Sequence, residues 1–207
     1  MTKHARILAV LGCVALTSLG QTLAARDASE SDRKALVEHL ERTRAAFLGS
    51  IDGLSEEQWA WKPAPDRWSV AEVAEHITAA ETMLRGLVTD QVLKAPASAE
   101  LLAKTQGHDQ VVLQRIPDRS APVQAPESLQ PKGTRKDRAD LTGAFTTARA
   151  TTIALAGDTS KDLRAHAMES PLGALDGYQW MLFISAHTER HTKQIEEVKA
   201  APVFPGT

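Results

Sequence analysis

Four long stretches of this 207-residue chain repeat apolar side chains every three or four residues, which is the spacing of a helix with one buried face. They span residues 31–51, 70–93, 137–156 and 175–199. We find no internal repeat and no alternating pattern of convincing strand length. Four amphipathic helices can bury their apolar faces against one another, so the sequence predicts an all-α fold, a four-helix bundle.

The second stretch has the clearest start signal. Ser69 precedes it and Glu72 follows three residues later, which is the arrangement of a capping box. Beyond it the helical pattern weakens over residues 94–135, which hold five of the ten prolines. We expect short helical pieces within residues 98–116 and connecting chain in the rest of this region.

Residues 1–25 have the composition of a signal peptide. A short basic start, MTKHAR, precedes the apolar run ILAVLGCVALTSLG, and the small residues of QTLAA offer a cleavage site. Charged residues follow closely, so stable membrane insertion is not expected. A lipoprotein signal ending at Cys13 would have an apolar segment of only about six residues, below the usual range. We therefore expect residues 26–207 to form one exported domain, periplasmic or secreted.

Cleavage would also set the charge and the thiol chemistry of the mature chain. It removes Lys3 and Arg6 and no acid, so 24 basic and 26 acidic side chains become 22 and 26, a formal charge of −4. This mild acidity does not favour nucleic-acid binding, which needs a concentrated basic face. Because Cys13 is the only cysteine, the mature chain would have no disulfide, no thiol nucleophile and no thiolate metal ligand.

Three histidines fall on the apolar faces of two predicted helices. His187 and His191 stand four residues apart, and at 100° per residue both point to the same side as Trp180. His76 likewise shares the apolar face of the second stretch. Glu189 points to the opposite side, so the run HTERH matches neither the H-E-x-x-H nor the H-x-x-E-H protease motif.

Two interpretations of these histidines follow from their chemistry. Neutral imidazoles are good ligands for Zn²⁺, Ni²⁺, Cu²⁺ or Fe²⁺, and three protein ligands leave a coordination position for water or substrate. Without a metal, converging rings are costly to bury, because every ring nitrogen needs a partner and a shared positive charge is unfavourable. The alternative is that each histidine is a hydrogen-bonded core residue, and the i, i+4 spacing alone is compatible with both.

Two separated segments resemble the DinB-like family. RWSVAEVAEHITAAE, residues 67–81, resembles its Trp-Ser helix start followed by an inward histidine. SAHTERHTKQIEEV, residues 185–198, resembles its last helix, with an H-x-x-x-H pair and the Gln-Ile that follows. The lead-in LSEEQWAWKPAPDRWS also fits, whereas residues 94–136 match poorly. The resemblance covers essentially the whole of residues 26–207.

The resemblance implies a DinB-like four-helix bundle in which one histidine of the second helix and two of the fourth bind a metal. By position these are His76, His187 and His191. The implied cofactor is one divalent ion, with Zn²⁺, Ni²⁺ or Fe²⁺ expected. Some relatives are metal-dependent transferases that use bacillithiol, mycothiol or glutathione, many have no known reaction, and family bundles often pair as homodimers.

The leading hypothesis is therefore an exported metal-binding bundle acting on a small molecule as a hydrolase or as a thiol-dependent transferase. Export adds weight to a hydrolase or to a binding role, because cytosolic thiols are not guaranteed outside the cell. The alternative is a non-catalytic bundle that binds a ligand or a partner. We find no G-x-S-x-G elbow, Walker loop or dinucleotide glycine fingerprint.

No catalytic acid or base is assigned. Glu72 and Glu81 lie near the rim of the His76 face and could serve, but we interpret Glu72 as a helix cap and Glu81 as a solvated side chain. The tryptophans before the second helix are expected to pack the helix connection rather than to wall a ligand pocket: Trp59, Trp61 and Trp68. The remaining histidines of the predicted domain are left out of the site: His39, His108 and His166.

Overall fold

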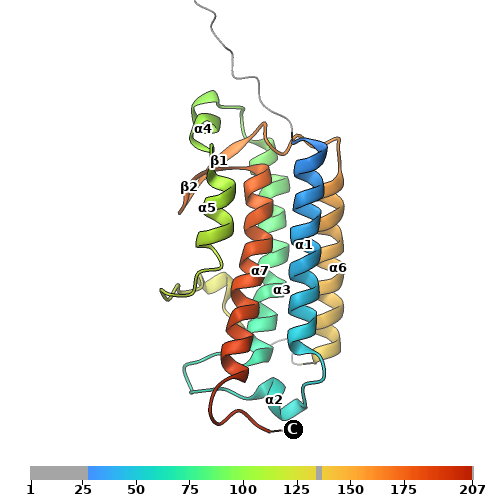
Figure 1. Ribbon diagram of the computed structural model, residues 1–207, viewed down its shortest axis with the longest axis vertical. Helices are drawn as coiled ribbons and strands as arrows, with labels where there is room; N and C mark the ends of the chain where they lie inside the picture. The colour runs from blue at the N-terminus through green and yellow to red at the C-terminus, as the bar shows by residue number, and fades with distance from the viewer. Residues whose placement is uncertain (1–27, 134–136, 207) are drawn as a thin grey trace, which may run out of the picture.

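The computed structural model describes residues 28–133 and 137–206, so the predicted signal peptide lies outside the described residues. Four long helices form an elongated bundle (Figure 1). Around the bundle, α1 contacts α7, α7 contacts α3, α3 contacts α6, and α6 contacts α1. The all-α, four-helix fold class is confirmed. The bounds of the four helices are α1 Glu30–Ile51, α3 Val70–Asp90, α6 Arg138–Gly157 and α7 Gly177–Lys199.

The order of the helices requires one long connection. In Figure 1, α1 and α7 run in one direction, and α3 and α6 run in the other. Because α3 and α6 are parallel neighbours, the chain between them must return along the length of the bundle. The return contains the short elements η1 (Val92–Lys94), α4 (Ala99–Lys104), α5 (His108–Arg115) and η2 (Glu127–Leu129). The helical pieces expected within residues 98–116 are therefore present as α4 and α5.

Each of the other two connections stays at a single end of the bundle, and the two lie at opposite ends (Figure 1). A single-turn helix, α2 (Glu56–Ala60), lies between α1 and α3. A hairpin of β1 (Ala167–Ser170) and β2 (Gly173–Asp176) joins α6 to α7, with the two strands antiparallel. We did not expect these strands from the sequence, because four residues are too few to show alternation.

The capping box predicted at the second helix is confirmed. The Glu72 amide donates to Ser69 Oγ at 3.2 Å, and the Ser69 amide donates to Glu72 Oε2 at 2.8 Å. These two bonds satisfy backbone donors that have no partner inside the helix. Glu72 also pairs with Lys62 at 3.0 Å, so its carboxylate is engaged at the helix start as predicted.

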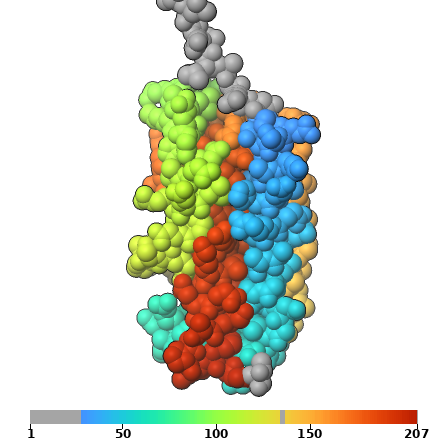
Figure 2. Space-filling view, in the orientation of Figure 1, coloured from blue at the N-terminus to red at the C-terminus, as the bar shows by residue number. Residues whose placement is uncertain are grey.

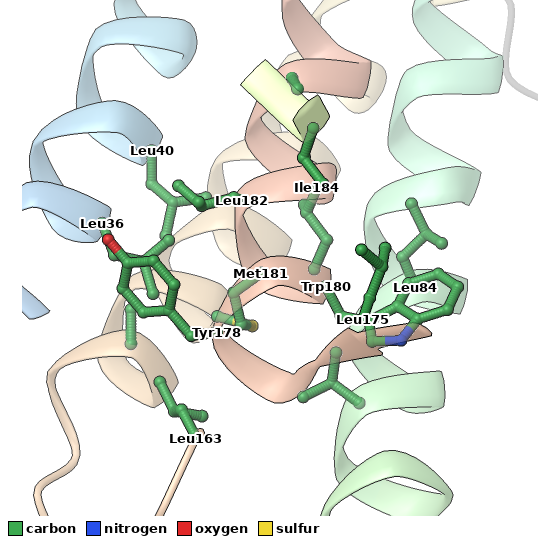
Figure 3. Close-up of a cluster of buried hydrophobic side chains, with 14 of the residues drawn as sticks. Leu36, Leu40, Leu84, Leu163, Leu175, Tyr178, Trp180, Met181, Leu182 and Ile184 are labelled. Carbon is green, nitrogen blue, oxygen red and sulfur yellow. The ribbon is translucent and has the colours of Figure 1, made fainter. Parts of the chain in front are cut away.

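The apolar core has two parts. The cluster nearest the hairpin is built largely from α1, α3 and α7 (Figure 3), and its labelled members include Leu36, Leu84, Tyr178 and Met181. The second cluster lies toward α2 and the carboxyl end of α7, where the Phe47 and Phe145 rings meet edge to face at 4.5 Å. Burial of these apolar faces is what holds the four helices together.

A buried polar network separates the two apolar clusters. Arg149 of α6 and Glu81 of α3 form an ion pair, and both side chains are 0% exposed. The prediction that Glu81 is a solvated residue is therefore wrong. Glu81 is buried because Arg149, from a helix far away in the sequence, pairs with its carboxylate and makes that burial tolerable.

Across residues 28–133 and 137–206, every helix is either too short or too polar to cross a bilayer.

Candidate metal centre

The three predicted ligands meet between α3 and α7. His76 Nε2 lies 3.3 Å from His187 Nε2 and 3.1 Å from His191 Nε2. The His76 side chain is 2% exposed, His191 is 9% exposed, and His187 is partly buried. Two antiparallel helices with facing apolar stripes thus bring together residues more than a hundred positions apart in the sequence.

Aromatic rings surround the histidines. Trp68, just before α3, has its ring centre 5.0 Å from that of His76 and 6.5 Å from that of His191. Phe183, one turn before His187 on α7, stacks on that ring at 6.3 Å. The expectation that the tryptophans pack the helix connection holds for Trp59, which is buried in the core, whereas Trp68 lies against the site.

Hydrogen bonds at the outer nitrogens fix the tautomers of two rings. His76 Nδ1 is 2.8 Å from the carbonyl oxygen of Leu129, and His191 Nδ1 is 2.8 Å from Gln194 Oε1. Carbonyl and amide oxygens only accept, so each Nδ1 carries the proton and donates it. In the neutral ring the lone pair is then on Nε2. The two Nε2 lone pairs therefore face each other across 3.1 Å, and neither nitrogen can donate to the other.

Protonation does not relieve this arrangement, because the site disfavours charged imidazoles. Burial lowers the pKa of His76 from the ordinary value of 6.5. Burial, the neighbouring His191 and His76, and Arg190 lower the pKa of His187 well below that value. Burial and the neighbouring His76 lower the pKa of His191 to about 3. All three rings are therefore neutral near pH 7, which is the form that binds metal.

The spacing of the Nε2 atoms fits a shared divalent ion. Metal–nitrogen bonds of about 2.0–2.1 Å place two ligands about 3.3–3.4 Å apart in tetrahedral geometry and about 2.8–3.0 Å apart at right angles. The observed separations of 3.1 and 3.3 Å fall in this range. A cation at this point would also remove the repulsion between the lone pairs. The donor set therefore fits a divalent metal that accepts imidazole ligands, such as Zn²⁺, Ni²⁺ or Fe²⁺.

The part of the return connection that follows α5, residues 116–133, is called the return segment below; it supplies contacts around the histidines that the sequence did not predict. It lies against α7 in Figure 2, and its Leu129 carbonyl accepts from His76. Arg119 of the same segment donates to Gln194 and to Glu197 on α7. A main-chain carbonyl has no sequence signature, so Leu129 could not be found. Gln194 could have been found, because a residue three positions after His191 lies beside it on a helix.

The other candidates lie outside this cluster. In the described part of the chain, the group able to hold a metal consists of the three histidines, with no carboxylate among them. Glu72 caps α3, and Glu81 binds Arg149. The histidines left out of the site stay out of it: His39 contacts Arg42, and His166 bonds the Ala95 carbonyl at 2.7 Å.

Comparison with known proteins agrees with this fold. The chain is 26% identical over 157 residues to the uncharacterized protein YuaE of Bacillus subtilis (strain 168), covering 75% of this chain and 92% of YuaE. Its structure is similar to that of YfiT from Bacillus subtilis, which is described as a probable metal-dependent hydrolase with an unusual four-helix bundle topology. That match has a TM-score of 0.51 and 12% sequence identity, and covers 87% of this chain and 93% of YfiT. The family model of the DinB superfamily matches residues 39–195, about three quarters of the sequence, and the chain therefore belongs to the DinB superfamily.

Proposed function

We propose that this protein binds one divalent metal ion through Nε2 of His76, His187 and His191 and uses it to act on a small molecule, with hydrolysis as the first reaction to test. The observation that carries the proposal is the pair of Nε2 lone pairs fixed 3.1 Å apart by hydrogen bonds at the opposite ring nitrogens. A protein core gains nothing from such an arrangement unless a cation is shared.

The three residues would act as a neutral set of ligands. Leu129 holds His76 in orientation and Gln194 holds His191. His187 completes the set from the turn of α7 that precedes His191. Three protein ligands leave at least one coordination position for water or substrate, which distinguishes catalytic metal sites from closed structural ones. When bound, a divalent ion at such a site supplies Lewis acidity to an oxygen or sulfur atom that reaches it.

Hydrolysis is favoured over thiol transfer for two reasons. YfiT, which shares the fold, is a probable metal-dependent hydrolase. Residues 1–25 are proposed to direct export, and a small-thiol cosubstrate is less available outside the cytosol. A thiol-dependent transferase and a non-catalytic binding protein are the outcomes to be distinguished from it by experiment.

Metal binding is tested first. Metal-free protein titrated with Zn²⁺, Ni²⁺ or Fe²⁺ is expected to take up one ion, and His191→Ala is expected to lose most of the affinity. His39→Ala is the matched control, because it removes an imidazole from a helix outside the site. Circular dichroism of each variant establishes that it is folded. Equal binding by His191→Ala and by wild type would refute the proposed ligand set.

Activity is tested next with the metal-loaded protein. A panel of esters, amides and phosphoesters is incubated with and without a small thiol, and the same panel is run with His191→Ala and His39→Ala. Turnover that needs the metal but no thiol supports the hydrolase. Turnover only with the thiol indicates a transferase, and metal uptake without any turnover on the panel favours the non-catalytic protein.

Export has its own test. Expression of the full chain in a bacterial host, followed by sequencing of the amino terminus, is expected to give a product that begins near residue 25 or 26. An uncleaved product that stays in the cytosol would contradict the proposal and return thiol transfer to equal standing.

A further inference from the structure

We propose that Gln194 and Arg119 are positioning residues for the metal centre. Arg119 fixes the amide of Gln194, and Gln194 in turn holds His191 with its Nε2 lone pair toward the other two rings. This inference rests on the proposed function, because metal binding is what requires the Nε2 lone pair of His191 to face the other two rings. The orientation itself is a property of the protein without metal and is measured separately.

The geometry of the amide carries the inference. His191 Nδ1 lies 2.8 Å from Gln194 Oε1, and Arg119 Nη1 lies 3.4 Å from the same oxygen. A guanidinium has only donors, so the atom of Gln194 that faces Arg119 must be the oxygen. The same oxygen then accepts the Nδ1 proton of His191. The opposite ring tautomer would place a lone pair on Nδ1 against the amide oxygen.

Arg119 is itself held rigidly. Its Nε donates to Glu197 Oε1 at 2.6 Å, and its Nη2 donates to Glu197 Oε2 at 2.7 Å. A bidentate pair of this kind fixes both the position and the plane of the guanidinium. Glu197, Gln194 and His191 are spaced three residues apart on α7, so the chain of bonds follows one side of that helix. Each group in it orients the next, ending at the ring nitrogen that faces the metal position.

A purely mechanical role for these residues is the main alternative. Arg119 belongs to the return segment and could serve only to attach that segment to α7. Arg190 already provides such attachment, donating to the carbonyls of Ile116 at 3.3 Å and Ala121 at 3.1 Å and to that of Asp118. The Glu197 pair also holds Arg119 without any help from Gln194. Attachment alone therefore gives no reason for the Gln194 oxygen to lie between Arg119 and His191.

The two interpretations predict different effects on the His191 ring. Partners of metal-bound histidines typically change metal affinity by about 10–100-fold when they are lost. Gln194→Leu removes the acceptor for Nδ1–H, so we expect His191 to populate the Nε2–H tautomer and Zn²⁺ to bind about 10–100-fold more weakly. Gln194→Glu keeps an acceptor for both His191 and Arg119 and is expected to retain the wild-type tautomer.

The experiment measures tautomers and affinity in the same set of full-length proteins. Long-range ¹H–¹⁵N spectra of the metal-free protein assign the protonated nitrogen of each histidine, and competition with a chromophoric chelator gives the Zn²⁺ affinity. The variants are Gln194→Leu, Gln194→Glu and Arg119→Met. Gln114→Leu, an exposed glutamine of α5, is the matched control. We expect the control and Gln194→Glu to behave as wild type, and Arg119→Met to give a mixture of His191 tautomers.

Each result decides one of the two claims. If His191 in Gln194→Leu keeps its proton on Nδ1 and its affinity for Zn²⁺ stays within twofold of wild type, the positioning role is overturned. If the tautomer changes in Gln194→Leu but wild type binds no metal, the positioning role stands and the proposed function fails. If Gln194→Leu does not fold, the Arg119→Met and Gln194→Glu spectra decide, since a positioning role requires them to differ from each other.

Discussion

The buried ion pair between Glu81 and Arg149 gives the sharpest test of how this bundle is held together. Arg149 makes five hydrogen bonds: two to Glu81 at 2.8 and 2.9 Å, one to the Leu40 carbonyl at 2.7 Å, and one each to Thr43 at 2.8 Å and Thr188 at 2.7 Å. These partners belong to α1, α3 and α7, so Arg149 on α6 links all four long helices. We predict that Glu81→Leu strongly destabilises the protein and that adding Arg149→Met restores much of the loss.

The magnitudes follow from what each change leaves behind. Glu81→Leu leaves a guanidinium without its counter-charge in the core, and removal of one partner of a buried pair costs about 3–5 kcal/mol. The double variant leaves no charge. Thr43 still donates to the His39 and Leu40 carbonyls, and Thr188 still donates to that of Ile184, so no hydroxyl loses its last partner. Replacement of a whole buried pair by apolar residues is often close to neutral.

Urea denaturation followed by circular dichroism measures these differences. A loss of about 3–5 kcal/mol corresponds to a fall of roughly 6–20 °C in Tm for a domain of this size. The double variant is expected to be more stable than Glu81→Leu alone, although it carries one more substitution in the core. Two results would contradict this description of a mutually dependent buried pair. One is a loss of less than about 1 kcal/mol in the free energy of unfolding for Glu81→Leu. The other is a loss in the double variant equal to the sum of the losses in the two single variants.

Three further predictions concern other parts of the molecule. Gly177→Ala should lower the free energy of unfolding by about 1–3 kcal/mol in urea denaturation, because the added Cβ would lie 2.7 Å from the Leu163 carbonyl oxygen. Gly49→Ala, whose Cβ would have nothing within 4 Å, should instead stabilise α1 by about 0.5–1 kcal/mol. Equal effects of the two changes would contradict the close approach at Gly177. Burial raises the pKa of Asp176 from 3.8 to about 6, despite the nearby Arg164, so its contribution to stability is full below about pH 4 and lost as the pH rises to about 6. The free energy of unfolding of wild type relative to Asp176→Asn should therefore fall across that interval, and a constant difference would refute the shift. Zn²⁺ at 100 times its Kd should raise the free energy of unfolding by about 2.7 kcal/mol in calorimetry, and the same rise in a variant without the three histidines would place the ion elsewhere.

The sequence predicted the features of the fold that depend on helical periodicity, namely the positions of the long helices and the direction of their side chains. The stretch expected at residues 31–51 forms Glu30–Ile51, and that expected at 137–156 forms Arg138–Gly157. The same rule placed the three histidines on the buried faces of two helices, and the family resemblance implied that they form one site. Such predictions succeed when position on a helix alone decides where a side chain points.

The predictions that failed or were absent depend on partners from elsewhere in the chain. Glu81 lies about 140° around α3 from His76, and only the approach of Arg149 from α6 decides that this direction is buried rather than solvated. The Leu129 carbonyl and Arg119 belong to a region with little periodicity, so no local pattern could place them against His76 and Gln194.

The arrangement of the helices connects these missed residues to the site. Because α3 and α6 are parallel neighbours, the chain cannot join them by a tight turn and must cross back along the bundle. The return passes beside α3 and α7, the two helices that carry the histidines, with α5 packed on α7 and η2 in contact with α3. This return connection supplies the hydrogen-bond acceptor of His76 and the arginine that donates to Gln194. We therefore expect substitutions in this segment to change the metal affinity of the proposed site without changing any of the three histidines.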